Sequence, residues 1–215
     1  HFRGMDIWHT CEPDQVGNDG WLGLALRELD PSAENVLTGV NIGQGLPRAM
    51  AVAGVPVTSI SDLETYGVMN SIEKQKLKEK SIQAFKDIYG QAIGSGRVSE
   101  YIGKTGLDVL KGADMLNEVA TNYQSNVEYA ENQVSKNLKD IARIHTSNLG
   151  TRIFYTSQGG YDTHANELPT HPKLIRELSN AVSDFMDDLE EHNLSEDVLI
   201  LVFTEFGRRM KDNGS

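Results

Sequence analysis

The sequence predicts an α/β domain with a mostly parallel sheet flanked by helices, and its last third carries this prediction. Residues 152–156 (RIFYT) and 198–203 (VLILVF) are short apolar runs typical of β-strands, and the second run predicts a strand buried on both faces. Between the two runs, apolar residues recur at helical spacing from position 175 to position 189. Because a strand–helix–strand unit has a right-handed crossover, its two strands should lie parallel in one sheet.

The first third of the chain predicts one further helix and one further strand. Residues 21–29 have apolar side chains at helical spacing. Residues 35–42 (NVLTGVNI) form a β-type run that ends in a Gly-Gln-Gly turn. We expect residues 46–70, which contain two prolines, to be a loop.

Residues 71–147 are strongly helical in pattern and carry three apolar stripes. We interpret this segment as a helical insertion or cap on the α/β domain. His145 ends the third stripe and is expected to pack or to cap a helix end. Pro172 suits the first turn of the helix that follows the strand at 152–156.

Composition limits the classes of function. The chain has 215 residues, enough for one domain with a hydrophobic core, and 39% of them are hydrophobic. Its formal net charge of -11 disfavours nucleic acid as a partner. The single cysteine, Cys11, excludes an intramolecular disulfide. No apolar run approaches the roughly 18 residues of a transmembrane helix.

Both ends of the sequence look cut. The chain begins at His1 without an initiator methionine and stops at Asn213-Gly214-Ser215, soon after a predicted strand. We therefore expect residues 1–215 to be a single incomplete domain of a longer protein.

Residues with metal-binding and acid–base chemistry follow the two strands of the C-terminal unit. The first strand leads into Asp162 and His164, and the second leads into Glu205, Arg208 and Arg209. Because the carboxyl ends of parallel strands lie at one edge of a sheet, we expect these side chains to meet there. Carboxylates and imidazole bind divalent metals such as zinc, manganese, calcium or magnesium. An arginine, Arg208 or Arg209, would hold an oxyanion.

Each of these residues also has an ordinary structural interpretation. Asp162 could be a turn or cap residue, and His164 could be a loop histidine at the surface. Glu205 could pair with one of the arginines that follow it. His171, which precedes a proline at a helix start, is expected to be structural.

Three segments resemble one large family, the domain of unknown function 1501. They are HFRGMDIWHT, GGYDTHANELPTHPKLIRELSNAVSDFMDDL and DVLILVFTEFGRRMKDNGS. The similarity runs from end to end and is least specific over residues 60–130. It implies a relative of the alkaline phosphatases and sulfatases, and an exported or periplasmic protein.

The resemblance also implies roles for individual residues. Asp162 and His164 match the positions that bind a metal in that superfamily. Glu205 keeps an acid at a second metal position, but Phe206 stands where sulfatase-like proteins have a histidine. His9 lies in the N-terminal block of the match, with His1, and would line the pocket.

The nucleophile of the superfamily should lie near or before the first residue of this chain. Thr10 is a weak candidate for it, because its position suits an ordinary helix residue better. The expected catalytic site is therefore only partly contained in residues 1–215.

Three functions remain open from the sequence. The first is a metal-dependent hydrolase of phosphate or sulfate esters, acting on a small molecule or a polysaccharide. The second is a non-catalytic exported protein that binds such a polymer or takes part in its assembly at the surface. The third is a helical interaction module built on residues 71–147.

Overall fold

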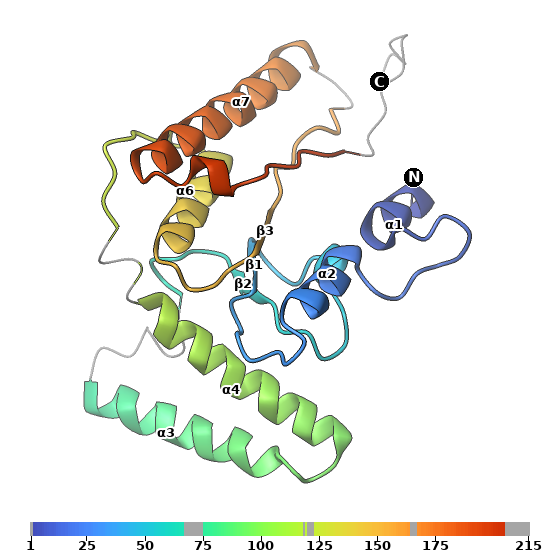
Figure 1. The fold of residues 1–215 in the computed structure, drawn as a ribbon, viewed down its shortest axis with the longest axis vertical. Helices are drawn as coiled ribbons and strands as arrows, with labels where there is room; N and C mark the ends of the chain where they lie inside the picture. The colour runs from blue at the N-terminus through green and yellow to red at the C-terminus, as the bar shows by residue number, and fades with distance from the viewer. Residues whose placement is uncertain (1, 67–74, 118, 120–122, 164–166, 205–215) are drawn as a thin grey trace.

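The computed structural model describes residues 2–66, 75–117, 119, 123–163 and 167–204. These residues form six α-helices, two short 3-10 helices and three β-strands (Figure 1). In chain order the elements are α1 (Phe2–Thr10), α2 (Trp21–Leu29), β1 (Gly39–Ile42), η1 (Arg48–Met50), β2 (Thr58–Ile60), α3 (Gln75–Ala92), α4 (Arg97–Asn117), α6 (Gln133–Thr146), β3 (Ile153–Thr156), α7 (Glu167–Glu191) and η2 (Ser195–Asp197).

The three strands form one parallel sheet in the order β2-β1-β3. Ile42 at the end of the central strand β1 pairs with Ile60 on β2 and with Thr156 on β3. Every residue of β1 is buried, as expected for the central strand of a parallel sheet. The predicted α/β class, the parallel sheet and the strand at residues 152–156 are therefore confirmed.

The main hydrophobic core joins β1 to helices α6 and α7. α6 contributes Leu138 and Ile141, and α7 contributes Phe185 and Leu189. Both sets belong to stripes that the helical spacing predicts. Full burial of a side chain of this size contributes about 1.5–3 kcal/mol relative to exposure.

Helix α6 begins with a side-chain cap. The side chain of Asn132 accepts a hydrogen bond from the backbone N–H of Ser135 at 2.9 Å, which satisfies one of the free donors of the first turn. Residues 123–132, which end at this cap residue, contain no helix. The prediction of continuous helical structure from 71 to 147 is wrong for this stretch, because contacts with α7 described below hold it as a loop.

Helices α3 and α4 form an antiparallel hairpin below the sheet in Figure 1. The two helices approach closely at Gly106: a Cβ atom there would lie 2.1 Å from Cδ1 of Tyr89. The C-terminal half of α4 packs on the core through Leu110 and Leu116. None of the described helices combines the length and the hydropathy that a membrane span requires.

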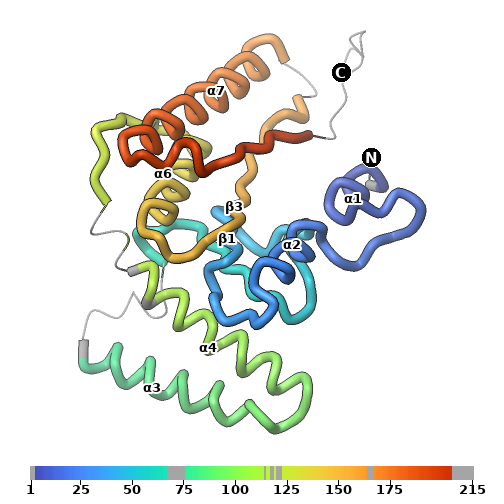
Figure 2. Tube along the Cα trace, viewed as in Figure 1, coloured from blue at the N-terminus to red at the C-terminus, as the bar shows by residue number. Residues whose placement is uncertain are grey.

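The predicted strand at residues 198–203 is not formed. Leu199 is 94% exposed and Leu201 is 64% exposed, so the prediction of a strand buried on both faces is wrong. The segment instead runs past the end of β3 (Figure 2), and the ring of Phe203 lies 6.3 Å from that of Tyr155. A continuous apolar run becomes a buried strand only where other layers cover both of its faces.

Two boundaries also differ from the sequence prediction. β2 lies inside the segment 46–70, which was expected to be a loop. The sequence does not reveal this strand, because three residues with a central serine show almost no alternation of apolar and polar side chains. α7 begins at Glu167, so Pro172 lies inside the helix and not in its first turn. Its ring removes the N–H that would bond to the carbonyl of Leu168.

Candidate functional site

The sequence predicts a site at the carboxyl ends of two strands, at 152–156 and 198–203. Residues 198–203 do not form a strand, and the described neighbour of β3 in the sheet is β1. After β1 the chain turns through Gly43-Gln44-Gly45 and leads to β2 on one side. After β3 it passes through Gly159-Gly160-Tyr161-Asp162 and leads to α7, which packs beside α6 (Figure 1). Ligands of open parallel sheets usually bind beyond the carboxyl ends of the strands.

Polar side chains fix the two strand ends against each other. The Thr156 hydroxyl donates to the carbonyl of Ile42 at 3.0 Å and accepts from the amide of Asn137 on α6 at 2.8 Å. On β1, the amide of Asn41 donates to the carbonyl of Gly45 at 2.8 Å. The starting points of both loops are therefore held by hydrogen bonds.

The loop after β3 is tied to α7. The Tyr161 hydroxyl donates to Oε1 of Gln158 at 2.8 Å, and Gln158 donates to the carbonyl of Leu174. Burial raises the pKa of Tyr161, and the charge of Glu177 raises it further, so the phenol stays a donor. The ring of His171 lies edge-on to Tyr161 at 6.0 Å.

Only one of the three predicted metal ligands falls within the described residues. Asp162 is exposed and follows the loop that Tyr161 anchors. His164 and Glu205 lie outside the described residues, as do Arg208 and Arg209. In the part of the chain that the structure describes, no three His, Cys, Asp or Glu side chains form a group that could hold a metal ion.

Helix α1 carries the N-terminal candidates. His9 has a buried Nδ1 atom with no hydrogen-bond partner among the described residues. Thr10 is buried, and its hydroxyl donates to the carbonyl of Asp6 at 2.8 Å, so it serves as a helix-end residue. The ring of Trp8 stacks on that of Phe203 at 5.5 Å, which brings α1 close to the segment that passes β3. His1 lies outside the described residues.

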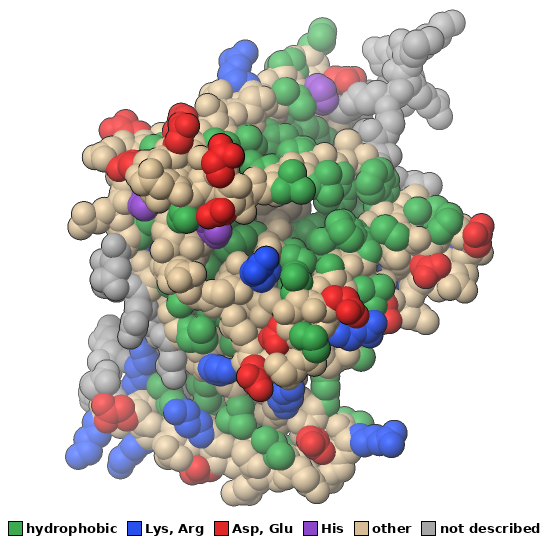
Figure 3. Space-filling view, viewed as in Figure 1, with side chains coloured by type: hydrophobic (Ala, Val, Ile, Leu, Met, Phe, Trp, Pro, Cys, Tyr) green, Lys and Arg blue, Asp and Glu red, His purple; other side chains and the backbone are tan. Residues whose placement is uncertain are grey.

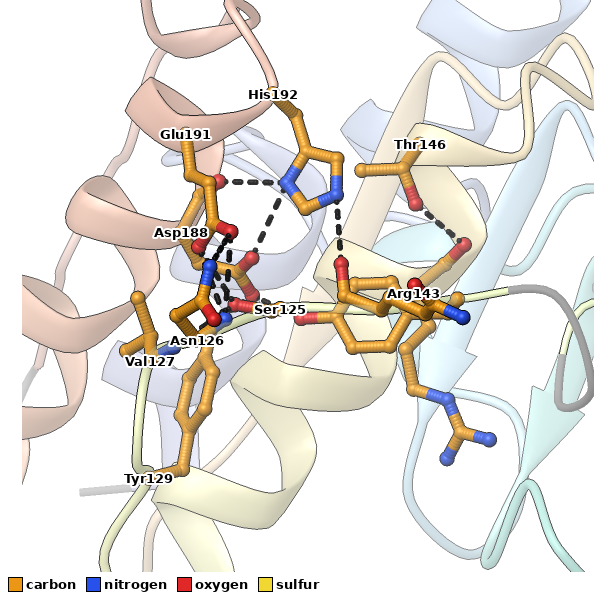
Figure 4. Close-up of polar contacts among 11 residues, drawn as sticks. Ser125, Asn126, Val127, Tyr129, Arg143, Thr146, Asp188, Glu191 and His192 are labelled. Atoms are coloured by element: carbon orange, nitrogen blue, oxygen red, sulfur yellow. Dashed lines mark hydrogen bonds and ion pairs between the residues drawn. The ribbon is translucent and has the colours of Figure 1, made fainter.

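A second polar cluster, which the sequence analysis missed, surrounds Asp188 on α7 (Figure 4). The Asp188 carboxylate is fully buried, and Oδ2 accepts hydrogen bonds from the hydroxyls of Tyr123 and Tyr129. Nδ1 of His192 lies 3.3 Å from Oδ1 of Asp188. One turn along, Glu191 accepts hydrogen bonds from Asn126. The cluster thus joins the loop at 123–132 to the end of α7.

The electrostatics of this cluster indicate a structural role. Burial raises the pKa of Tyr123 and of Tyr129, and the hydrogen bonds to Asp188 raise both further. Both hydroxyls therefore remain donors over the ordinary pH range. One signal could have revealed the cluster: Asp188 lies three residues after Phe185 on the apolar stripe of α7, where a charge needs buried partners.

A cavity of about 420 Å³ lies beside the cluster. Its polar lining includes Thr146, Ser147 and His192. The two hydroxyls donate to the carbonyl of Arg143, and the His192 ring nitrogens face backbone carbonyls of Asp188 and Gln124. Because these groups are engaged within the protein, the cavity offers few of the convergent polar groups of a ligand site.

Comparison with known proteins gives the family and nothing finer. Neither the curated proteins nor the solved structures contain a match to this sequence. The profile of one family matches residues 15–215, which is most of the chain. The chain therefore belongs to the family described as Protein of unknown function (DUF1501).

Proposed function

We propose that this chain is part of an exported, metal-dependent hydrolase of phosphate or sulfate esters with an alkaline phosphatase-like fold. Its substrate would be a small-molecule or polysaccharide ester. The observation that carries the proposal is the position of Asp162. It lies in the loop that follows β3, and the carboxyl end of β3 pairs with the end of the central strand β1.

The residue types at this edge fit a divalent metal. Asp162, His164 and Glu205 supply two carboxylates and an imidazole, a ligand set that suits zinc or manganese, and carboxylates also suit magnesium or calcium. The exposed position of Asp162 leaves it accessible to an ion from solvent. A bound metal would polarise the ester and lower the pKa of a bound water or alcohol.

Two further residues would act on the substrate. Arg208 would hold the oxyanion of the phosphate or sulfate group through its planar guanidinium. His9 would transfer a proton, because its Nδ1 is the one nitrogen of α1 side chains that is buried without a partner among the described residues. Thr10 is a poor nucleophile here, because its hydroxyl is buried and already bonded to Asp6.

The first experiment is elemental analysis of the purified full-length protein. The parent is compared with an Asp162→Ala, His164→Ala variant, and Asp14→Ala serves as control because Asp14 is another exposed aspartate in a loop. Near-stoichiometric metal in the parent and in the control, but not in the double variant, would support the metal site.

A second measurement addresses the reaction. Metal-loaded full-length protein is assayed with an aryl phosphate and an aryl sulfate, and Arg208→Lys should reduce turnover by at least about tenfold because the bidentate contact is lost. Absence of metal after reconstitution would refute the hydrolase and favour the non-catalytic binding protein instead.

A further inference from the structure

The hairpin of α3 and α4 carries an apolar surface in addition to the one that joins its two helices. Ile88 on α3 is 68% exposed and Val98 on α4 is 74% exposed. The exposed apolar residues of the hairpin helices, called here the hairpin face, are Leu77, Ala84, Ile88, Val98, Tyr101, Ile102 and Val109. Exposed apolar side chains that form a continuous surface are typical of protein–protein contact sites.

The residues of the hairpin face share one stripe on each helix. On α3 they stand at positions 77, 84 and 88, and on α4 at 98, 101, 102 and 109. These spacings of three, four, seven and eleven residues return to the same side of an α-helix. Each helix therefore has one exposed, mainly apolar stripe, which Ser81 interrupts on α3 and Thr105 on α4.

Both stripes point to the same side of the hairpin. The contact between the two helices involves Tyr89 and Ala92 on α3, and Gly103 and Gly106 on α4. Successive residues of an α-helix are rotated by about 100° around the helix axis. On both helices, the contact positions are therefore rotated by about a quarter of a turn from the centre of the exposed stripe, in the same sense along the chain. In antiparallel helices the same sense of rotation leads to the same side, so the stripes form one two-helix surface.

The charges along the edges of this surface are in complementary order. Lys80 on α3 and Asp108 on α4 lie about 18 Å and about 17 Å from the hairpin loop, at 1.5 Å per residue. Asp87 and Lys104 lie about 8 Å and about 11 Å from it. At about 17–18 Å from the hairpin loop, α3 therefore carries a positive charge and α4 a negative one. At about 8–11 Å from the loop the signs are reversed.

We propose that the hairpin face packs against the same face of a second copy of this chain, forming an antiparallel four-helix bundle. A two-fold axis along the hairpin would place α3 of each copy beside α4 of the other. The apolar stripes would then meet in the centre, and Lys80 would face Asp108, and Asp87 would face Lys104, across the interface.

The size and net charge of the hairpin also favour a second copy. The helices have 18 and 21 residues, so the face is about 27 Å long and about 20 Å wide, a projected area of about 540 Å² or about two thirds of the roughly 800 Å² per partner of a standard interface. Residues 75–117 have seven Lys and Arg against five Asp and Glu, whereas the whole chain has 20 against 31. Figure 3 shows the basic side chains gathered over the hairpin and acidic ones over α7. Two copies would therefore repel each other least at the hairpin.

The test begins with sedimentation velocity of the full chain over a concentration series. We expect a monomer–dimer equilibrium whose Kd rises by more than about tenfold in Ile88→Asp and in Ile102→Asp. Leu46→Asp, at a residue 54% exposed outside the hairpin, is the matched control and should leave the Kd unchanged. Circular dichroism of each variant must match the parent, so that loss of association is not loss of folding.

A charge exchange tests the arrangement of the two copies. Asp87→Lys and Lys104→Asp should each raise the Kd by about tenfold, because each places like charges opposite one another twice in the dimer. The variant with both changes should restore the parent Kd. Asp87 and Lys104 lie on opposite outer edges within one chain, so this rescue reports contact between copies.

The outcomes separate clearly. Loss of the dimer in the face variants together with rescue by the charge exchange would support the proposal. A protein that stays monomeric at all concentrations would overturn it. A dimer that survives Ile88→Asp and Ile102→Asp, or a charge exchange without rescue, would also overturn it, because association would then use another surface or another orientation.

Discussion

The Tyr129 hydroxyl donates a hydrogen bond to Oδ2 of the buried Asp188 at 2.6 Å. This contact links a loop without regular structure to the last turns of α7, and Tyr123 donates to the same oxygen. Each hydroxyl that donates to a buried carboxylate stabilises it, and removing one donor costs free energy. The loop conformation therefore depends on these two phenols.

We expect Tyr129→Phe to lower the free energy of unfolding by about 1–3 kcal/mol, because it leaves a buried carboxylate oxygen with one donor fewer. Urea denaturation measures this change. Tyr101→Phe, at a residue that is 60% exposed, is the control and should stay within about 0.5 kcal/mol of the parent. Equal stability of the two variants would show that Asp188 does not depend on Tyr129.

Thr156→Val should destabilise the carboxyl edge of the sheet. The substitution keeps the shape of the side chain but removes the hydroxyl that connects Asn137 on α6 with the carbonyl of Ile42. We expect a loss of about 1–3 kcal/mol, with Thr156→Ser close to the parent because it keeps the oxygen. Thermal unfolding of both variants checks this, and a Val variant as stable as the Ser variant would refute it.

Gly20→Ala should be far more damaging than Gly4→Ala. A Cβ atom on Gly20 would lie 2.2 Å from the carbonyl oxygen of Ala49, and backbone cannot move aside as a flexible side chain can. We expect a cost of about 1–3 kcal/mol. A Cβ on Gly4 in α1 meets no atom within 4 Å, so Ala should be neutral or stabilising by up to about 1 kcal/mol. Denaturant midpoints that fall in the reverse order would contradict the packing of α2 on η1.

Acidification should destabilise the protein through His145. Burial lowers the pKa of His145 in the folded protein, and the charge of Asp197 only partly opposes this. The unfolded chain therefore binds the proton more readily, so this contribution is complete above the unfolded pKa of about 6.5 and is lost as the pH falls below it. We expect His145→Gln to weaken the fall in melting temperature between about pH 7.5 and about pH 5.5. His171→Gln is the control, and an unchanged pH profile in His145→Gln would exclude this origin.

The sequence predicted the elements whose side chains repeat against one core. The stripes that contain Leu138 and Phe185 became α6 and α7, and the strand at 152–156 took its place beside β1. The segment at 198–203 shows the limit of this reasoning. An apolar run predicts that its side chains are buried, but it does not show which other elements cover them, and here Leu199 and Leu201 are exposed. The strand that leads into Asp162 lies in the parallel sheet as predicted, whereas the convergence of the predicted ligands stays a prediction.

Asp188 illustrates a different limit. Its partners Tyr123 and Tyr129 are about sixty residues away in the sequence, at separations of 65 and 59. Only the packing of α6 against α7 brings the loop close to it. Periodicity describes one element at a time, so a polar contact between distant elements leaves no pattern in either of them.

The order β2-β1-β3 also determines how the molecule can fold. β1 can pair with β2 early, but its contact with β3 joins residues that are 114 positions apart, as between Ile42 and Thr156. Closing so long a loop carries an entropic cost before the new contacts compensate for it, and folding slows accordingly. During synthesis one edge of β1 therefore stays unpaired until helices α3, α4 and α6 and then β3 have been synthesised. A chaperone or early collapse of α6 onto β1 would protect that edge in the meantime.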